Sequence, residues 1–196
     1  MEQREYFNQI ADKWDKMTRH DPQKINWLLD LIPFGLPCRV LDAGCGTGVL
    51  APYLLKRTAE EIVGVDFAEQ MIHRAEQKYQ ADNLHFVCAD VLKGGLGRFD
   101  LIVCYSMFPH FPDKPAAIGT LAGMLHDGGR LAILHSQGRE AINSLHMEAS
   151  DMTVQEARLA PPEQFYRWVT GAGLRLESLV DNSQVFAVVA QKNAEA

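Results

Sequence analysis

The stretch VLDAGCGTGVL, from Val40 to Leu50, decides the fold of this 196-residue chain. It reads as a short buried strand, an acidic residue, glycines at Gly44, Gly46 and Gly48, and the start of a helix. Glycine lets the backbone turn sharply and approach a ligand closely, and a helix N-terminus offers unpaired N–H groups to an anion. The stretch therefore predicts a ligand-binding loop of the nucleotide type.

The rest of the chain alternates between apolar runs, bounded by glycine and acidic residues, and longer stretches of helical period. This alternation is typical of an α/β protein, and we expect three Rossmann-like layers around a mostly parallel sheet of seven strands. The predicted strands cover residues 38–42, 61–66, 84–89, 99–105, 129–135, 174–181 and 184–191. The predicted helices cover 48–57, 68–80, 114–126 and 161–172.

The last two predicted strands are separated only by Asn182 and Ser183. So short a connection joins antiparallel neighbours, and the sheet should therefore end in an antiparallel β-hairpin. The length suits a single domain over residues 1–196. Within it, residues 1–35 are expected to form an N-terminal helical cover, and residues 136–160, which do not fit the alternation, an insertion or lid.

The composition restricts the kind of protein that carries this loop. The net charge of −6 argues against a nucleic-acid partner, because such surfaces use Lys and Arg to displace counterions. We expect no membrane partner and a cytoplasmic location, because the apolar runs are short and the N-terminal residues too charged for a signal peptide. The four cysteines lack C-x-x-C spacing and are expected to be reduced.

Two further acidic residues close predicted strands. Asp66 ends the second strand in GVDFAEQM, where a carboxylate can accept hydrogen bonds from both hydroxyls of a ribose. Asp90 ends the third strand in VCADVL, where it can accept one from an adenine amino group. Open α/β sheets bind ligands at the carboxyl ends of their strands, so both residues are expected at the same site as the glycine loop.

This series of strand, acidic residue, GCGTG and two acidic strand ends resembles the class I methyltransferases that use S-adenosylmethionine (SAM), over about residues 36–135. Within that family the chain resembles small-molecule enzymes similar to the C-methylating enzymes of quinone biosynthesis and the broad methyltransferase domain 11 and 25 groups. The resemblance implies SAM as cofactor, S-adenosylhomocysteine (SAH) as product and a small-molecule methyl acceptor. It also implies that YFNQIADKWD covers the cofactor with Tyr6, Phe7 and Trp14.

The resemblance implies ten cofactor-binding residues, which are Asp42, Gly44, Cys45, Gly46, Asp66, Phe67, Met71, Asp90, Val91 and Cys104. The first four surround the methionine end of SAM, and Asp66 takes the ribose. Asp90 and the backbone of Val91 read the adenine, while Phe67 and Met71 flank the adenosine. The last of the ten, at the end of the fourth strand, borders the methyl donor.

Three histidines and a tyrosine are the candidate catalytic residues. Tyr105 ends the fourth predicted strand, His110 follows it, and His135 ends the neighbouring fifth strand. His146 belongs to the insertion, where a helix over 139–149 would place it on the polar stripe. We expect the three histidines to converge on the acceptor side of the cofactor, as a general base with orienting partners.

The same three imidazoles could instead hold zinc or iron. We favour the general base, because no carboxylates that would steady a metal site can be identified.

Two other functions fit parts of the pattern. A nicotinamide-dependent oxidoreductase also has a glycine turn and a later acidic residue, but its G-x-G-x-x-G spacing requires glycine at Val49. A SAM-binding or metal-binding protein without turnover is the second alternative, which conversion of SAM to SAH would exclude. After the fourth strand, YSMFPHFPDKP lacks the Asn/Asp-Pro-Pro-aromatic motif of certain amino-group methyltransferases. The acceptor's identity, and whether C, N, O or S is methylated, stays open.

Overall fold

The computed structural model describes residues 3–33, 35, 38–57, 60–149, 154 and 157–193. The strands are β1 (Val40–Ala43), β2 (Ile62–Asp66), β3 (Leu84–Cys88), β4 (Phe99–Tyr105), β5 (Leu125–His135), β6 (Leu174–Asp181) and β7 (Phe186–Lys192). The helices are α1 (Gln3–Met17), α2 (Pro22–Asp30), α3 (Ala51–Leu54), α4 (Glu69–Lys78), α5 (Lys114–Gly123), α6 (Arg139–Met147) and α8 (Pro162–Gly171), with short 3-10 helices η1 (Val91–Lys93) and η2 (Phe108–His110).

The strands form one sheet in the order β3-β2-β1-β4-β5-β7-β6. The first five in this order are parallel, and β7 is antiparallel to both β5 and β6. The predicted fold class and terminal hairpin are thus confirmed. The direction of chain progression reverses between β1 and β4, which is where an open α/β sheet leaves a crevice at the strands' carboxyl ends.

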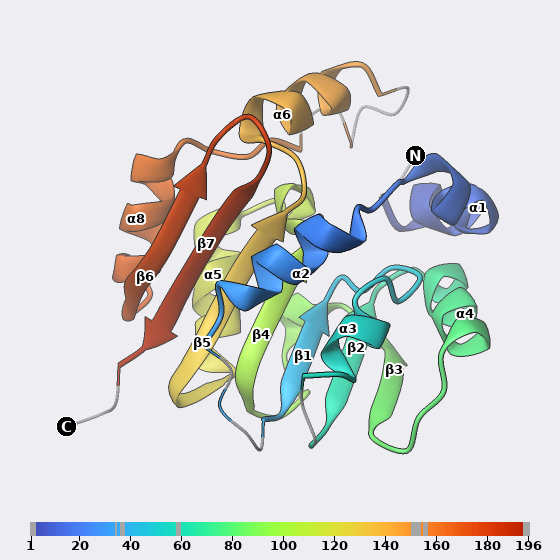
Figure 1. The fold of residues 1–196 in the computed structure, drawn as a ribbon, viewed down its shortest axis with the longest axis horizontal. Coiled ribbons are helices and arrows are strands. Elements are labelled where there is room, and N and C mark those ends of the chain that lie inside the picture. The colour runs from blue at the N-terminus through green and yellow to red at the C-terminus, as the bar shows by residue number, and fades with distance from the viewer. Residues whose placement is uncertain are drawn as a thin grey trace.

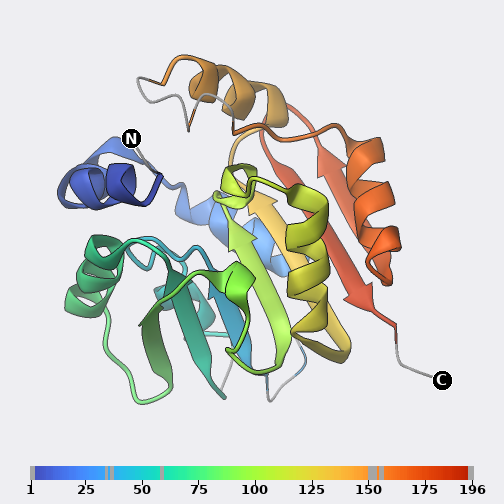
Figure 2. The same ribbon diagram turned by 180° about the vertical axis from the view of Figure 1, so that it is seen from behind.

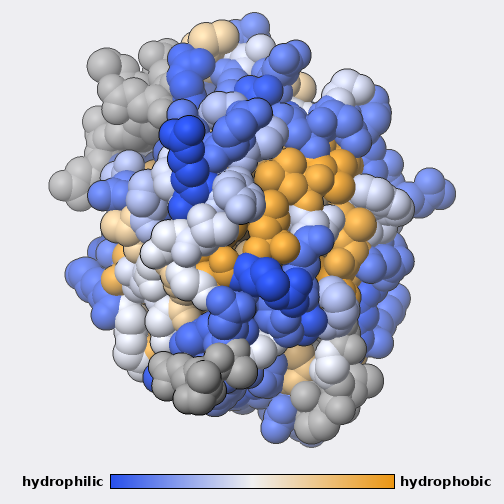
Figure 3. Space-filling model, turned by 90° about the vertical axis from the view of Figure 1, so that its left-hand side faces the viewer, coloured by the Kyte–Doolittle hydropathy of each residue, from blue (hydrophilic) through white to orange (hydrophobic). Residues whose placement is uncertain are grey.

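Helices cover both faces of the sheet, α2 and α3 on one face and α5 and α8 on the other (Figures 1 and 2). β1 and β2 are buried along their whole length, which suits their nearly continuous apolar sequence. The outer strand β6 is covered less completely: Leu179 and Val180 are only partly buried. Figure 3, which views the molecule from this side, shows hydrophobic residues reaching the surface there.

Two predicted elements differ most in extent from the structure. The helix expected over 48–57 is reduced to α3, because Gly48 has a left-handed φ of 81° and the residues before Ala51 form turns. β5 begins at Leu125 rather than at 129. Leu125, its first residue, pairs with Phe99 through a register irregularity, and Gly128 and Gly129 lie inside the strand.

The predicted N-terminal cover divides into two helices with different roles in packing. In α2, Ile25, Leu28 and Leu29 are fully buried in the core against the sheet. In α1, the buried residues Phe7 and Ala11 belong to a separate small cluster with α4. Only α1 therefore lies over the carboxyl edge of the parallel strands (Figure 1).

The predicted insertion 136–160 contains α6, while its residues 150–153 and 155–156 lie outside the described part of the chain. The sequence of a helix over 139–149 places Ile142, Leu145 and Ala149 on an apolar stripe, of which Ile142 is buried but Leu145 is 57% exposed. Asn143, from the polar stripe, accepts a hydrogen bond from the Leu159 N–H at 2.8 Å and donates to its carbonyl at 3.0 Å. The polar stripe of α6 is therefore used to hold the following segment.

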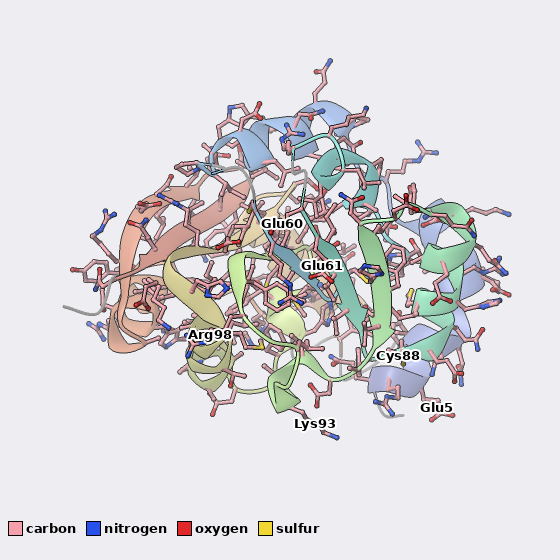
Figure 4. All side chains as sticks on the ribbon, turned by 90° about the horizontal axis from the view of Figure 1, so that it is seen from below. Glu5, Glu60, Glu61, Cys88, Lys93 and Arg98 are labelled. Atoms are coloured by element: carbon pink, nitrogen blue, oxygen red, sulfur yellow. The ribbon has the colours of Figure 1, made fainter. Side chains whose placement is uncertain are left out.

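The opposite, amino-terminal edge of the sheet carries a different set of side chains. Arg39 forms an ion pair with Glu61 and donates to the carbonyl of Arg98 at 2.6 Å. Glu61 and Arg98 are labelled in Figure 4, which views this edge from below. Among the described residues, no helix is long and apolar enough to cross a membrane.

Candidate functional site

A cavity of about 260 Å³ lies at the carboxyl edge of the sheet, and residues of α1 form part of its lining. Eight of the ten predicted cofactor residues and two of the four predicted catalytic residues line it, namely Gly44, Cys45, Gly46, Asp66, Phe67, Met71, Asp90, Val91, Tyr105 and His110. Phe7 and Trp14 of α1 also line it, as the N-terminal motif suggested. The folded chain thus brings segments from the N-terminus to η2 around one space.

Four predicted site residues do not line the cavity: Asp42, Cys104, His135 and His146. Asp42, Cys104 and His135 are buried, with exposed fractions of 4%, 0% and 2%. Their side chains lie behind the cavity wall, so a direct contact with a ligand in this structure is confined to the other ten. The roles assigned to all fourteen predicted site residues remain predictions.

Asp66 joins the end of β2 to the glycine loop. One carboxylate oxygen accepts a hydrogen bond from the Gly46 N–H at 3.0 Å, and the other accepts one from the Ala68 N–H at 2.9 Å. Gly46 has a φ of 53°, in the left-handed region that favours glycine, so the loop sequence is what permits this contact. Burial raises the pKa of Asp66 to about 6, while these N–H groups counteract the rise.

Asp42, at the carboxyl end of β1, is a second buried carboxyl group close to the loop. Burial, together with the negative charge of Asp66, raises the pKa of Asp42 to about 7. The pair therefore carries less than its full negative charge at neutral pH. A cation entering the cavity would favour ionisation of both groups.

Asp42→Asn is expected to raise the melting temperature of the ligand-free protein at about pH 8 and to leave it unchanged near pH 3. As pH rises from about 3.8 to about 7, the unfolded chain loses the Asp42 proton before the folded chain does, so wild-type stability falls across this window. Asparagine has no proton to lose. Thermal melts at both pH values would check this, with the exposed Asp82→Asn as control. An equal shift at both pH values would contradict it.

Asp90 immediately precedes η1. One of its carboxylate oxygens accepts a hydrogen bond from the Leu92 N–H at 3.0 Å, which caps this short helix. The second oxygen has no hydrogen bond of this kind. Asp90 and the buried Val91 both line the cavity at the end of β3, as expected for residues that read an adenine.

The structure adds cavity residues that the sequence did not reveal, notably His20 and Met107. The Met107 side chain lies over Gly44, where a Cβ atom would come within 2.7 Å of it. Gly44 therefore makes room for a neighbouring side chain as well as for a turn. Both missed residues lie in connections, where no periodicity marks a functional position.

Two of the candidate histidines, His110 and His146, lie side by side and are partly buried, while His135 is fully buried. The rings of His110 and His146 have centroids 5.2 Å apart, and Phe7 contacts His110 edge to face at 5.3 Å. Burial and the neighbouring imidazoles lower the pKa of both His110 and His135 to about 3. These two rings are therefore neutral at physiological pH, and no described residue forms a hydrogen bond with the buried Nε2 of His135.

Metal binding by this group has no support in its ligand geometry. Among the residues that the structure describes, no three His, Cys, Asp or Glu side chains are arranged to hold a metal ion. His146 instead uses its Nδ1 atom in a short contact with the carbonyl of Ala157.

α1 is held over the cavity largely by contacts at the surface. Asp12 pairs with Arg74 of α4, and Asp15 accepts hydrogen bonds from Thr47 at 2.6 Å and Lys78 at 2.8 Å. Exposed ion pairs contribute about 0–1 kcal/mol each, and the apolar cluster beneath α1 is separate from the main core. This attachment suits a helix that can open.

Hydrogen exchange is expected to be faster in α1 than in β4, and to slow in α1 when SAH is added. The physical reason is that a ligand in the cavity would contact Phe7 and Trp14 and add apolar contacts to a weakly attached helix. Exchange measured by mass spectrometry with and without SAH would check this. If the amides of α1 exchange as slowly as those of β4, both with and without SAH, α1 is a fixed part of the fold.

Comparison with known proteins gives independent evidence on the family of this chain. A methyltransferase domain family matches residues 40–129. The ubiquinone biosynthesis O-methyltransferase of Coxiella burnetii is 32% identical over 152 residues, which cover 70% of this chain and 63% of that protein. The malonyl-[acyl-carrier protein] O-methyltransferase of Acetivibrio thermocellus is 30% identical over 145 residues, covering 72% of this chain and 51% of that protein.

Solved structures with lower identity show the same fold. A methyltransferase in complex with the Haloferax volcanii Trm112 methyltransferase activator has a TM-score of 0.83 and 17% identity, with 96% of this chain and 98% of that chain covered. Magnesium protoporphyrin IX methyltransferase of Synechocystis, solved with bound SAH, has a TM-score of 0.75 and 19% identity, with 97% of each chain covered.

The sheet order, the glycine loop with its acidic strand ends, and these relatives define one class of protein. The chain belongs to the class I SAM-dependent methyltransferases, whose cofactor is SAM. It spans about half the length of the malonyl-[acyl-carrier protein] relative and 63% of the Coxiella one, so the relatives' substrates are not transferred with the family.

Proposed function

We propose that this protein transfers the methyl group of SAM to a small, uncharged acceptor in the cytoplasm. The observation that carries the proposal is the position of Asp66. Its buried carboxylate is hydrogen-bonded to the glycine loop and lines the cavity, where each oxygen can accept a further hydrogen bond. Such a double acceptor is suited to the two hydroxyls of a ribose.

The residues around Asp66 fit the rest of SAM. The loop Gly44 to Gly46 would hold the methionine end, because its backbone is accessible from the cavity. Asp90 and Val91 would hold the adenine, with Met71 and Phe67 along the adenosine. The net positive charge of SAM also suits a wall whose acidic residues, Asp66 and the underlying Asp42, lie close together.

SAM supplies an electrophilic methyl group, so the chain's own tasks are to align the acceptor, exclude water and receive a proton. α1 covers the cavity with Phe7 and Trp14, which would exclude water from the reacting atoms. Tyr105 and His110 line the cavity and are the predicted catalytic residues that can touch an acceptor. His135 and His146 lie behind them and would act by positioning.

The side chains at the acceptor end favour an uncharged acceptor. Among the described residues that line the cavity, none is Lys or Arg, and the two carboxylates are assigned to the cofactor. A phosphate or carboxylate acceptor would find no cation to pair with. A neutral hydroxyl compound, such as a phenol, fits the neutral imidazoles and the hydroxyls of Tyr105 and Ser106, and two relatives are named O-methyltransferases.

Calorimetry with SAM, SAH and NADH tests this function directly. We expect binding of SAM and SAH and none of NADH, and conversion of SAM to SAH when phenols of differing size are supplied. Tight binding of NADH without binding of SAM would favour the oxidoreductase alternative. Binding of SAM without turnover on any acceptor in a cell extract would favour a SAM-binding protein that does not catalyse methyl transfer.

A further inference from the structure

His20 connects the covering helix to the central strands. It lies between α1 and α2 and lines the cavity together with Tyr105, the last residue of β4. The His20 Nδ1 atom is 3.1 Å from the Tyr105 hydroxyl oxygen, and the two ring centroids are 5.4 Å apart. The covering segment is thus hydrogen-bonded to the carboxyl end of the sheet.

The Tyr105 hydroxyl is held from the other side as well. The side chains of Ser106 and Ser136 are its further hydrogen-bond partners. Ser106 has a φ of 53°, and it is the one residue other than glycine with a positive φ in the described part of the chain. Such a conformation is strained for a residue with a side chain and is found mainly where the surrounding structure enforces it at functional sites.

Resting on the proposed methyltransferase function, we propose that His20 is the proton acceptor of the reaction and Tyr105 its positioning residue. In this proposal the His20 Nδ1–H donates to the Tyr105 oxygen, and the Tyr105 O–H donates to Ser106 or Ser136. This tautomer leaves a lone pair on Nε2, which has no hydrogen bond to another described residue. This second ring nitrogen is free to take a proton from an acceptor in the cavity.

The reaction then balances as a simple displacement. The acceptor oxygen forms its new bond to the methyl carbon while its O–H bond breaks, and the proton passes to Nε2 of His20. The electron pair of the carbon–sulfur bond stays on the sulfur of SAH, which becomes neutral. The imidazolium later gives its proton to water.

The charges around His20 suit this role better than those around His110. Burial, with a smaller effect of Lys78 on α4, lowers the pKa of His20, whereas Asp15 on α1 raises it. His20 is therefore neutral at pH 7, and the Asp15 carboxylate would stabilise the imidazolium that forms. His110 also lines the cavity, but desolvation and the neighbouring His146 and Lys114 lower its pKa to about 3, which makes it a poor proton acceptor.

The position of His20 also couples proton transfer to closure of the cavity. Because His20 follows α1 directly, opening of that helix would draw it from Tyr105 and from the acceptor. The protein would then accept the proton only when the covering helix excludes water.

Nitrogen NMR of ¹⁵N-histidine-labelled protein, with and without SAH, tests the proposal without an acceptor. At about pH 7.5 we expect a neutral His20 with its proton on Nδ1, and loss of this tautomer preference in Tyr105→Phe. His73, exposed on α4, serves as the reference signal, and Tyr166→Phe as the matched control. A proton on Nε2, or an unchanged tautomer in Tyr105→Phe, would overturn the proposal. Failure of SAH to bind would count against the proposed function instead.

Methyl transfer to catechol and to the more acidic 4-nitrocatechol provides the second readout. His20→Asn keeps an amide that can donate to Tyr105 but removes Nε2. In His20→Asn we expect kcat with catechol to fall about 100-fold or more. With 4-nitrocatechol, which ionises without a base, kcat should fall less than about 10-fold. The affinity of this variant for SAM should equal that of the wild type. Equal losses with both compounds, or an equal loss in His73→Asn, would overturn the proposal. If the wild type methylates neither compound, the NMR measurement of the His20 tautomer alone decides between the two outcomes.

Discussion

Replacing Asp66 with alanine should weaken the binding of both SAM and SAH on the order of 30- to 150-fold, or ~2–3 kcal/mol. The ribose would lose a charged double acceptor in a buried site. The glycine loop would also lose the carboxylate that accepts from Gly46, so the loop itself would be less ordered. Titration calorimetry with each ligand measures the change directly.

The matched control for this variant is Asp82→Ala, which removes an exposed carboxylate. Its affinity for SAM should equal that of the wild type. Asp66→Asn is informative as an intermediate, because the amide oxygen still accepts one hydrogen bond while the charge is gone. Wild-type affinity in Asp66→Ala would show that the cavity does not bind ribose through this residue.

Phe108→Ala should destabilise the folded protein by about 3–5 kcal/mol. Phe108 is fully buried in η2, with ring centroids 5.6 Å from Phe111 and 5.3 Å from Phe165 of α8. Truncation would leave a cavity between the helix layer and the loop that carries His110. For a chain of this length, such a loss corresponds to a decrease in melting temperature of about 10 °C.

Tyr166→Ala is the control for Phe108→Ala, because Tyr166 lies on the same helix as Phe165 but is 55% exposed. Its melting temperature should stay within about 2 °C of the wild type, since surface substitutions usually change stability by less than 0.5 kcal/mol. Similar decreases in both variants would mean that the packing of η2 against α8 does not contribute as the structure indicates.

The sequence alone determined the layers, the sheet and the cofactor loop. Strands with Asp42, Asp66 and Asp90 at or just beyond their carboxyl ends are local patterns, and parallel strands bring these ends together. The strands over 99–105 and 174–181 are local patterns too, and they were predicted with the bounds that the structure has. Eight of the ten predicted cofactor residues line the cavity because they lie at these ends.

Only the tertiary structure decided which side chains surround the acceptor end. His135 ends β5 and His110 follows β4, so their places in the sequence are similar. In the structure His135 packs against Phe186 and does not line the cavity, whereas His110 does. His20 lies in a connection with no periodic pattern, and its partner Tyr105 is 85 residues away. Contacts of this kind depend on how α1 packs on α4 and how α6 binds the segment after it. Local periodicity does not predict either contact, because each depends on how separate segments of the chain pack together.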